Sequence, residues 1–224
     1  MLPWVQLGRA EVPGEATPLT LFQRGREFAI RIGPLALMSN TLHGSEEVLA
    51  EIACGRIAKR TSAKVLVGGL GMGYTTAAAL RQVGPDAQVI TAELVPGVVE
   101  WNRGPLAHLA GRPLDDPRAS IFAGDVGDAY RGKRGAFDAI LLDVDNGPNG
   151  LTRRANNWLY TPTGLRAAYE ALRDGGIFGV WSVAPDAEFT RRLAQSGFRV
   201  EEEIVRARRT SGGRHTLWLA TRRR

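Results

Sequence analysis

The sequence predicts an α/β fold built on a mostly parallel sheet. Three observations lead to this prediction. A glycine-rich turn follows a short apolar run within residues 64–74 (KVLVGGLGMGY), acids end three further apolar runs, and helix-forming stretches alternate with these runs. Sheets of this kind bind ligands just outside the carboxyl ends of their strands. We therefore expect one ligand-binding edge that contains the turn and the acids.

The turn carries glycines at four positions, Gly68, Gly69, Gly71 and Gly73, with the spacing G-x-G-x-G over the last three. Without a Cβ, the backbone can take positive φ and approach a nucleotide closely, and the N–H groups of the next helix face an electron-rich ligand. Such a turn alone can also be purely structural, so the next strands decide between the two interpretations.

Each of the next three strands ends in an acid. Residues 88–93 end in Glu93, whose carboxylate can accept hydrogen bonds from both hydroxyls of a ribose. Residues 120–125 end in Asp125, which can accept from an adenine amino group, and residues 136–143 end in Asp143. One acid after a strand is more often a helix cap or a turn former. Three acids beside a glycine turn instead predict a nucleotide-binding edge.

Composition is consistent with a soluble enzyme in the reducing cytoplasm. The chain has 224 residues, 44% of them hydrophobic, and a single cysteine, Cys54, so neither an intrachain disulfide nor a cysteine metal site can form. The three histidines lack metal-ligand spacing, so we expect no metal. No apolar stretch is long enough for a membrane span, and no signal peptide is expected. The net charge of +6 comes almost entirely from arginine, which we attribute to codon bias and not to a nucleic-acid partner.

The chain divides into an N-terminal β-hairpin cap, residues 1–44, and a catalytic domain, residues 45–224. Short strands are expected in the cap at residues 19–24, 27–32 and 35–39, separated by turns. So few strands bury little surface by themselves. We therefore expect the cap to pack on the main domain or on a second subunit, and predict a homodimer or larger assembly.

The remaining elements continue the alternation of strand and helix. Residues 146–150 read as a flexible linker of the kind that forms a lid. The further expected elements are helices at 45–60, from 96 to about 104, at 163–173 and at 185–195, and strands at 177–183, 199–206 and 214–221.

Taken together, these motifs resemble the spermidine synthase family, a branch of the class I S-adenosylmethionine-dependent transferases. The resemblance rests on the runs VLVGGLGMGYTTAAAL, ELVPGVVEWNRGPLAHL, DDPRASIFAGDVGDAY, FDAILLDVDNGP and LYTPTGLRAAYEALRDGGIFGVW. It covers roughly residues 45–183, and more weakly the cap. It implies a Rossmann-like sheet with an antiparallel last strand, and an adenosyl ligand that carries a sulfonium or thioether.

The resemblance also implies roles for single residues. It places the four glycines around the ligand, Glu93 with Leu94 at the ribose and Asp125 with Val126 at the adenine. Asp143 and Asp145 match the two acids of the family's D-x-x-D-P loop, which deprotonate and hold an ammonium nucleophile. DVDNGP has one residue fewer between them, and Asp145 is equally well explained as a turn-capping residue.

Contacts to the acceptor are expected from Glu47, Asn146, Trp158 and Tyr160. Glu47 matches the glutamate of the family's Tyr-His-Glu, which here reads Ser45-Glu46-Glu47. The two aromatic residues can surround a cationic centre through cation–π contacts. For Trp181, inside a strand, ordinary packing is the preferred interpretation.

The transferred group is left open by one departure from the family. Its turn, G-G-G-D-G-G, contains an acid that helps to hold an aminopropyl ammonium, whereas Leu70-Gly71-Met72 contains none. We therefore expect first a methyltransferase that uses S-adenosylmethionine and acts on a small amine or acid. The alternative is an aminopropyltransferase that uses decarboxylated S-adenosylmethionine to make a polyamine. A noncatalytic ligand- or nucleic-acid-binding relative is the third possibility.

Overall fold

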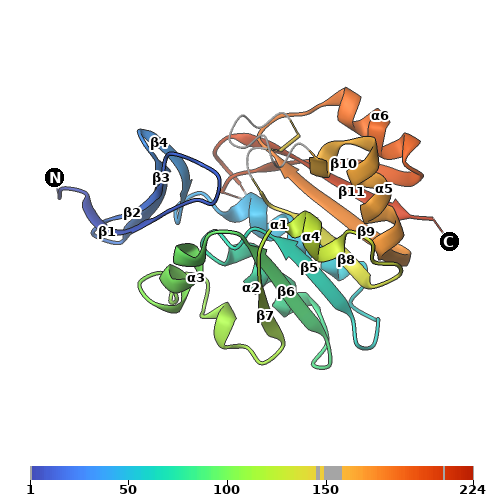
Figure 1. Ribbon diagram of the computed structural model, residues 1–224, viewed down its shortest axis with the longest axis horizontal. Helices are drawn as coiled ribbons and strands as arrows, with labels where there is room; N and C mark the ends of the chain where they lie inside the picture. The colour runs from blue at the N-terminus through green and yellow to red at the C-terminus, as the bar shows by residue number, and fades with distance from the viewer. Residues whose placement is uncertain (1, 145–146, 149–157, 209, 224) are drawn as a thin grey trace.

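The protein consists of two sheets, shown in Figure 1 for a computed structural model that describes residues 2–144, 147–148, 158–208 and 210–223. The smaller sheet is antiparallel and projects from one side of the molecule. Its strands, in spatial order, are β1 (Val5–Ala10), β2 (Leu19–Arg24), β3 (Glu27–Ile32) and β4 (Leu35–Ser39).

The larger sheet has seven strands in the order β10-β11-β9-β8-β5-β6-β7. All neighbours pair in parallel except β11, which runs antiparallel to both β9 and β10. This arrangement confirms the predicted fold, including the antiparallel last strand. The strands are β5 (Lys64–Gly68), β6 (Gln88–Glu93), β7 (Ala119–Ala123), β8 (Phe137–Leu142), β9 (Leu172–Ser182), β10 (Phe198–Arg206) and β11 (Arg214–Arg222).

Helices cover both faces of the larger sheet. Successive side chains of a strand point to opposite faces, so Leu66 belongs to the apolar core on one side while Val65 and Val67 belong to the core on the other. The helices α1 (Gly44–Gly55) and α2 (Tyr74–Gln82) pack on the Val65 side, and α4 (Val126–Tyr130), α5 (Pro162–Ala171) and α6 (Ala187–Gln195) pack on the Leu66 side.

The small sheet is fixed to the larger domain through a third apolar cluster. This cluster joins Leu21 and Ile30 of the small sheet to Leu70 and Met72 of the glycine turn. It also includes Trp101 of α3 (Pro96–Arg103). The packing places the small sheet directly above the carboxyl ends of β5 and β6, where the ligand edge is predicted.

Three element boundaries differ from the sequence prediction, each for a local reason. Strand β1 was not predicted, because VQLGRA is mostly exposed and buries only Ala10 fully. Helix α1 ends at Gly55 and not near residue 60, since turns follow. Strand β9 begins at Leu172, inside the predicted helix, and its register shifts near a glycine pair in which Gly175 has φ of +68°.

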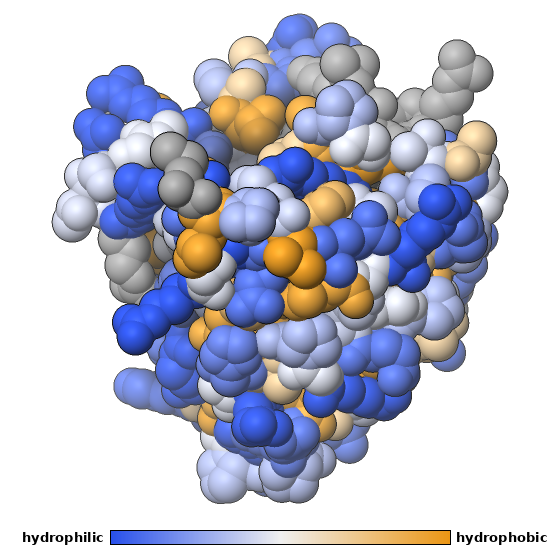
Figure 2. Space-filling view, turned by 90° about the vertical axis from the view of Figure 1, so that its left-hand side faces the viewer, coloured by the Kyte–Doolittle hydropathy of each residue, from blue (hydrophilic) through white to orange (hydrophobic). Residues whose placement is uncertain are grey.

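Exposed apolar side chains lie on and next to the small sheet, including Leu2, Val5 and Leu35, which are 67%, 55% and 52% exposed. Figure 2 shows orange apolar residues scattered among polar ones on this side of the molecule. The predicted self-association stays a prediction. Among the helices that the structure describes, none combines the length and the apolar character that crossing a membrane requires.

Candidate active site

The glycine turn and the loop after β8 touch at the carboxyl edge of the larger sheet. The backbone N–H of Asp143 donates to the carbonyl of Gly68 at 3.0 Å. Gly69 has φ of +86°, and a Cβ on it would lie 2.6 Å from the Asp143 carbonyl oxygen. Only glycine fits this close approach in this conformation. The first glycines of the turn therefore hold the loop that carries Asp143.

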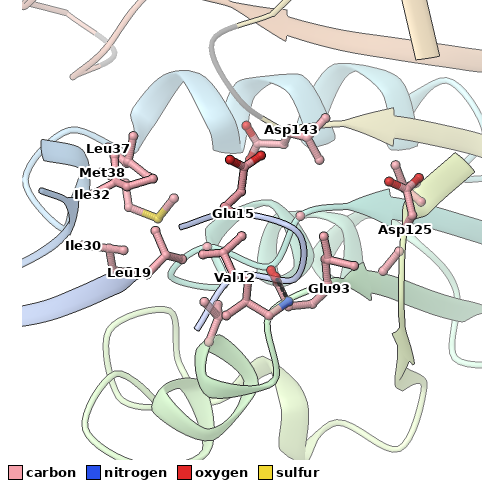
Figure 3. A pocket seen from close by; sticks show the side chains of 18 of the residues that line it. Val12, Glu15, Leu19, Ile30, Ile32, Leu37, Met38, Glu93, Asp125 and Asp143 are labelled. Carbon is pink, nitrogen blue, oxygen red and sulfur yellow. Dashed lines mark hydrogen bonds between the residues drawn. The ribbon is translucent and has the colours of Figure 1, made fainter. Parts of the chain in front are cut away.

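A cavity of about 190 Å³ lies between this edge and the small sheet. Figure 3 shows apolar side chains of the small sheet on one side of it, and Glu93 and Asp125 on the other. The lining includes five carboxylates and, among the described residues, no lysine, arginine or histidine. The acids are Glu15, Glu46, Glu93, Asp125 and Asp143, and the apolar residues from the small sheet and its loops are Val12, Leu19, Ile30, Ile32, Leu37 and Met38.

Glu93, at the end of β6, supports the turn while it lines the cavity. Its Oε2 accepts from the backbone N–H of Leu70 at 3.0 Å, and its Oε1 accepts from that of Val95 at 2.8 Å. Glu93 thus ties the glycine turn to the segment after β6 at the edge of the cavity. Leu94, the next residue, also lines the cavity.

Asp125 begins α4 as its N-cap. Its Oδ1 accepts from the backbone N–H of Gly127 at 2.7 Å, which is the usual capping geometry. Val126 follows in the cavity wall and packs on Gly68. Capping therefore fixes the Asp125 carboxylate at the end of the cavity where the sequence places an adenine.

The Asp143 carboxylate accepts a hydrogen bond from the Thr75 hydroxyl at 2.5 Å. Burial raises the pKa of this carboxyl to about 6, and the bond from Thr75 acts in the opposite direction. A group with a pKa near 6 is mostly ionised at neutral pH and still basic enough to take a proton. Asp143 is thus suited to act as a general base.

Glu46, in the first turn of α1, is one of the two lining acids that sequence reasoning missed, the other being Glu15. Burial raises the pKa of Glu46 well above the ordinary value, and the charges of Asp143 and then Glu47 raise it further. A signal for it exists in the sequence. Glu46 precedes the buried residues Leu49 and Ala50 by three and four positions, so it lies on the inward face of α1.

The structure places Glu47 away from the cavity, in correction of the sequence assignment. Its Oε1 accepts from Arg81 Nη2 at 3.0 Å, and its Oε2 lies 3.2 Å from His43 Nδ1. Adjacent helical residues point about 100° apart, so burying Leu49 turns Glu46 inward and Glu47 toward Arg81.

The two aromatic residues expected at the acceptor do not line the cavity. Trp158 stacks on Tyr130 and lies under the guanidinium of Arg131. Tyr160 is 3% exposed within the core, and its hydroxyl donates to the Val144 carbonyl at 3.4 Å. Trp181, which the sequence assigned to packing, does line the cavity.

The other predicted residues divide into three groups. Gly69 and Gly71 line the cavity, whereas Gly68 ends β5 and Gly73 is the N-cap of α2. Asp145 and Asn146 lie outside the described residues, as does most of the predicted lid. Within the described ranges, no three histidine, cysteine or acidic side chains are grouped so that they could hold a metal ion.

The fold and this edge define a class. The strand order, the glycine turn and the acids at the ends of β6, β7 and β8 are those of the class I methyltransferase-like fold. A solved spermidine synthase from Thermotoga maritima superposes with a TM-score of 0.76 over 97% of this chain and 72% of that one, at 19% identity. An O-methyltransferase structure from Klebsiella pneumoniae has a TM-score of 0.56 over 80% of each chain, at 21% identity.

Sequence comparison then indicates which branch of this class the chain resembles. The polyamine aminopropyltransferase of Mycobacterium tuberculosis is 32% identical over 124 residues, which are 54% of this chain and 23% of that protein. The match thus spans less than a quarter of the relative's length. No family model matches the chain. The predicted resemblance to the spermidine synthase family is confirmed.

The expectation of methyl transfer as the main activity was wrong. The curated relatives that match, at 31–32% identity, are polyamine aminopropyltransferases. The reasoning gave decisive weight to the acid that is missing from Leu70-Gly71-Met72 and did not foresee that Glu46, from α1, lines the same cavity as Gly71 and Asp143.

Proposed function

We propose that this protein transfers an aminopropyl group from decarboxylated S-adenosylmethionine to an amine, with a diamine or polyamine as the acceptor. One observation carries the proposal: the described residues that line the cavity include five carboxylates and no cationic side chain. The chain as a whole has a net charge of +6, so this concentration of acids is local and opposite to the overall charge.

The charge of the lining discriminates between the two donors. S-adenosylmethionine carries an α-carboxylate, whose burial needs a paired cation or several hydrogen-bond donors. Decarboxylated S-adenosylmethionine lacks this group and carries a sulfonium and an ammonium, both positive. Amine acceptors are cationic as well, so every charged group of the proposed reactants is complementary to the cavity.

Each acid at the carboxyl edge of the sheet would contact a different part of the reactants. Asp125 would accept from the adenine amino group and Glu93 from the ribose hydroxyls. Asp143 would accept a proton from the acceptor's ammonium, so that the amine nitrogen can attack the aminopropyl carbon that is bonded to the sulfonium. The new C–N bond forms as the C–S bond breaks, and the electron pair of that bond goes to sulfur, which leaves as the neutral thioether methylthioadenosine.

A direct comparison of donors tests the proposal. The purified protein is given decarboxylated S-adenosylmethionine or S-adenosylmethionine, each with a panel of diamines and polyamines, and products are measured by mass spectrometry. We expect methylthioadenosine and an amine that has gained one aminopropyl group, from the decarboxylated donor only. Methylated product from S-adenosylmethionine, or tighter binding of that donor, would overturn the proposal.

A further inference from the structure

Two acids of the cavity lining, Glu15 and Glu46, have no role at the adenosine end or in the proton transfer, and Glu46 is the one whose charge interacts with that of Asp143. Glu46 lines the cavity together with Asp143, Gly71 and Trp181. Its carboxylate accepts no hydrogen bond from the part of the chain that the structure describes, although it lies on the inward face of α1. Carboxylates in such positions are normally paired or hydrogen-bonded. The missing partner is therefore expected to arrive with a ligand.

The neighbours of Glu46 indicate the charge of that partner. Asp143 and Glu47 are close enough to repel a charge on Glu46, and no cationic side chain is among the described residues that line the cavity. Two adjacent carboxylates cannot both ionise cheaply without a cation between them. A compact, positively charged group with several N–H donors could hydrogen-bond to the carboxylates of both Glu46 and Asp143. A primary ammonium has three such donors.

We propose that Glu46 binds a primary alkylammonium group of a substrate, at a subsite next to Asp143. The inference rests on the proposed function, because that reaction supplies two substrates with such a group: the aminopropyl end of the donor and the far amine of the acceptor. Glu46 reaches the cavity from α1, so this subsite comes from an element other than the glycine turn.

The experiment measures binding of three probes to wild type and to Glu46→Gln by calorimetry. The probes are decarboxylated S-adenosylmethionine, methylthioadenosine, which has the same adenosine end without the ammonium, and the best diamine in the presence of methylthioadenosine. Hydrogen bonds to a charged group correspond to a loss of about 10- to 100-fold in affinity when the charge is removed. Methylthioadenosine binding should change less than about twofold.

The binding measurements with the donor and with the diamine distinguish the two sources of the ammonium. Weaker binding of the decarboxylated donor alone assigns Glu46 to the donor, and weaker binding of the diamine alone assigns it to the acceptor. Equal affinity of wild type and Glu46→Gln for both cationic probes would overturn the inference. So would an equal loss for methylthioadenosine, because that result indicates a structural role.

Two further variants keep the result interpretable. Glu51→Gln removes the same charge from the same helix outside the cavity lining, and should leave all three affinities unchanged. Glu46→Asp keeps the charge and should recover part of the lost affinity. If wild type itself fails to bind the decarboxylated donor, the proposed function fails, which is distinct from a wild type that binds and a Glu46→Gln variant that binds equally well.

Discussion

One aspartate lies near the amino end of strand β8 and another directly follows its carboxyl end, and the two have opposite electrostatic surroundings. Asp138, at the amino end, is 1% exposed and accepts from Arg60 at 2.6 Å, Arg173 at 2.8 Å and the backbone N–H of Lys64 at 2.8 Å. Asp143, just past the carboxyl end, accepts from the Thr75 side chain, and the described residues provide no other side-chain donor to it; the charge of Asp143 acts on that of Glu46.

The contrast shows what distinguishes a structural charge from a functional one in this fold. At the amino end, the chain neutralises its own buried acid with two arginines. At the carboxyl end, Asp143 and Glu46 have no cationic partner among the residues that the structure describes, at a cost in electrostatic free energy that a cationic ligand can offset. Burial alone does not distinguish the two aspartates. What distinguishes them is that Asp138 is paired with arginines of the same chain.

The largest effect is expected at the carboxyl end. Asp143→Asn keeps the size of the side chain and removes its basicity, so aminopropyl transfer should fall by about 100-fold or more. Binding of methylthioadenosine, which lacks the ammonium, should change little. Steady-state rates with the best amine, together with calorimetry, check both parts. An Asp143→Asn variant that turns over at the wild-type rate would remove the residue from proton transfer.

A smaller effect is expected for the acid that supports the glycine turn. Glu93→Ala should weaken binding of methylthioadenosine by about 1.5–3 kcal/mol, the range for hydrogen bonds to a charged group. Part of this loss would come from the turn, because Leu70 and Val95 lose their acceptor. Glu100→Ala, on exposed α3 surface, is the control. Calorimetric affinity unchanged within error in Glu93→Ala would exclude Glu93 from the site.

The amino-end aspartate should affect stability and not the reaction. Asp138→Asn leaves Arg60 and Arg173 with a neutral partner, which should lower the free energy of unfolding by about 1–3 kcal/mol. These arginine side chains are 31% and 44% exposed, so water replaces part of the lost interaction. Denaturant unfolding measures the change, and the folded variant should keep wild-type turnover. Loss of turnover without loss of stability would contradict the comparison.

The smallest effect concerns pH. Asp143 acts as a base only when ionised, so kcat/KM should rise as pH increases through its pKa of about 6. The Thr75 hydroxyl stabilises the ionised form, and Thr75→Val removes it. The acid limb of the profile should therefore move to higher pH, by up to about one unit. A shift toward lower pH, or none, would show that Asp143 does not set this limb.

The sequence was sufficient for the parts of the site that follow from strand order. Residues 88–93 alternate in polarity and end in an acid, and β6 has those bounds. Glu93, Asp125 and Asp143 were found because each ends a strand, and parallel strands bring their carboxyl ends to one edge.

The cavity residues that lie outside the larger sheet could not be predicted from strand order. Glu15 lies in the loop between β1 and β2, and β1 itself lacks an apolar pattern. The choice between Glu46 and Glu47 depends on the rotation of α1, which is set by the packing of Leu49 and Ala50 against the sheet. Such placements depend on tertiary contacts and not on local periodicity.

Trp181 gives the cavity a built-in optical reporter. Its ring lines the cavity, and its Nε1–H donates to the Ser45 hydroxyl at 3.0 Å, which lies 2.8 Å from Nδ1 of His215. Burial lowers the pKa of His215, which favours the neutral imidazole. The chain has five tryptophans, so replacing the other four would isolate the fluorescence of Trp181, and its change on mixing would then allow substrate arrival to be timed by stopped flow without an attached dye.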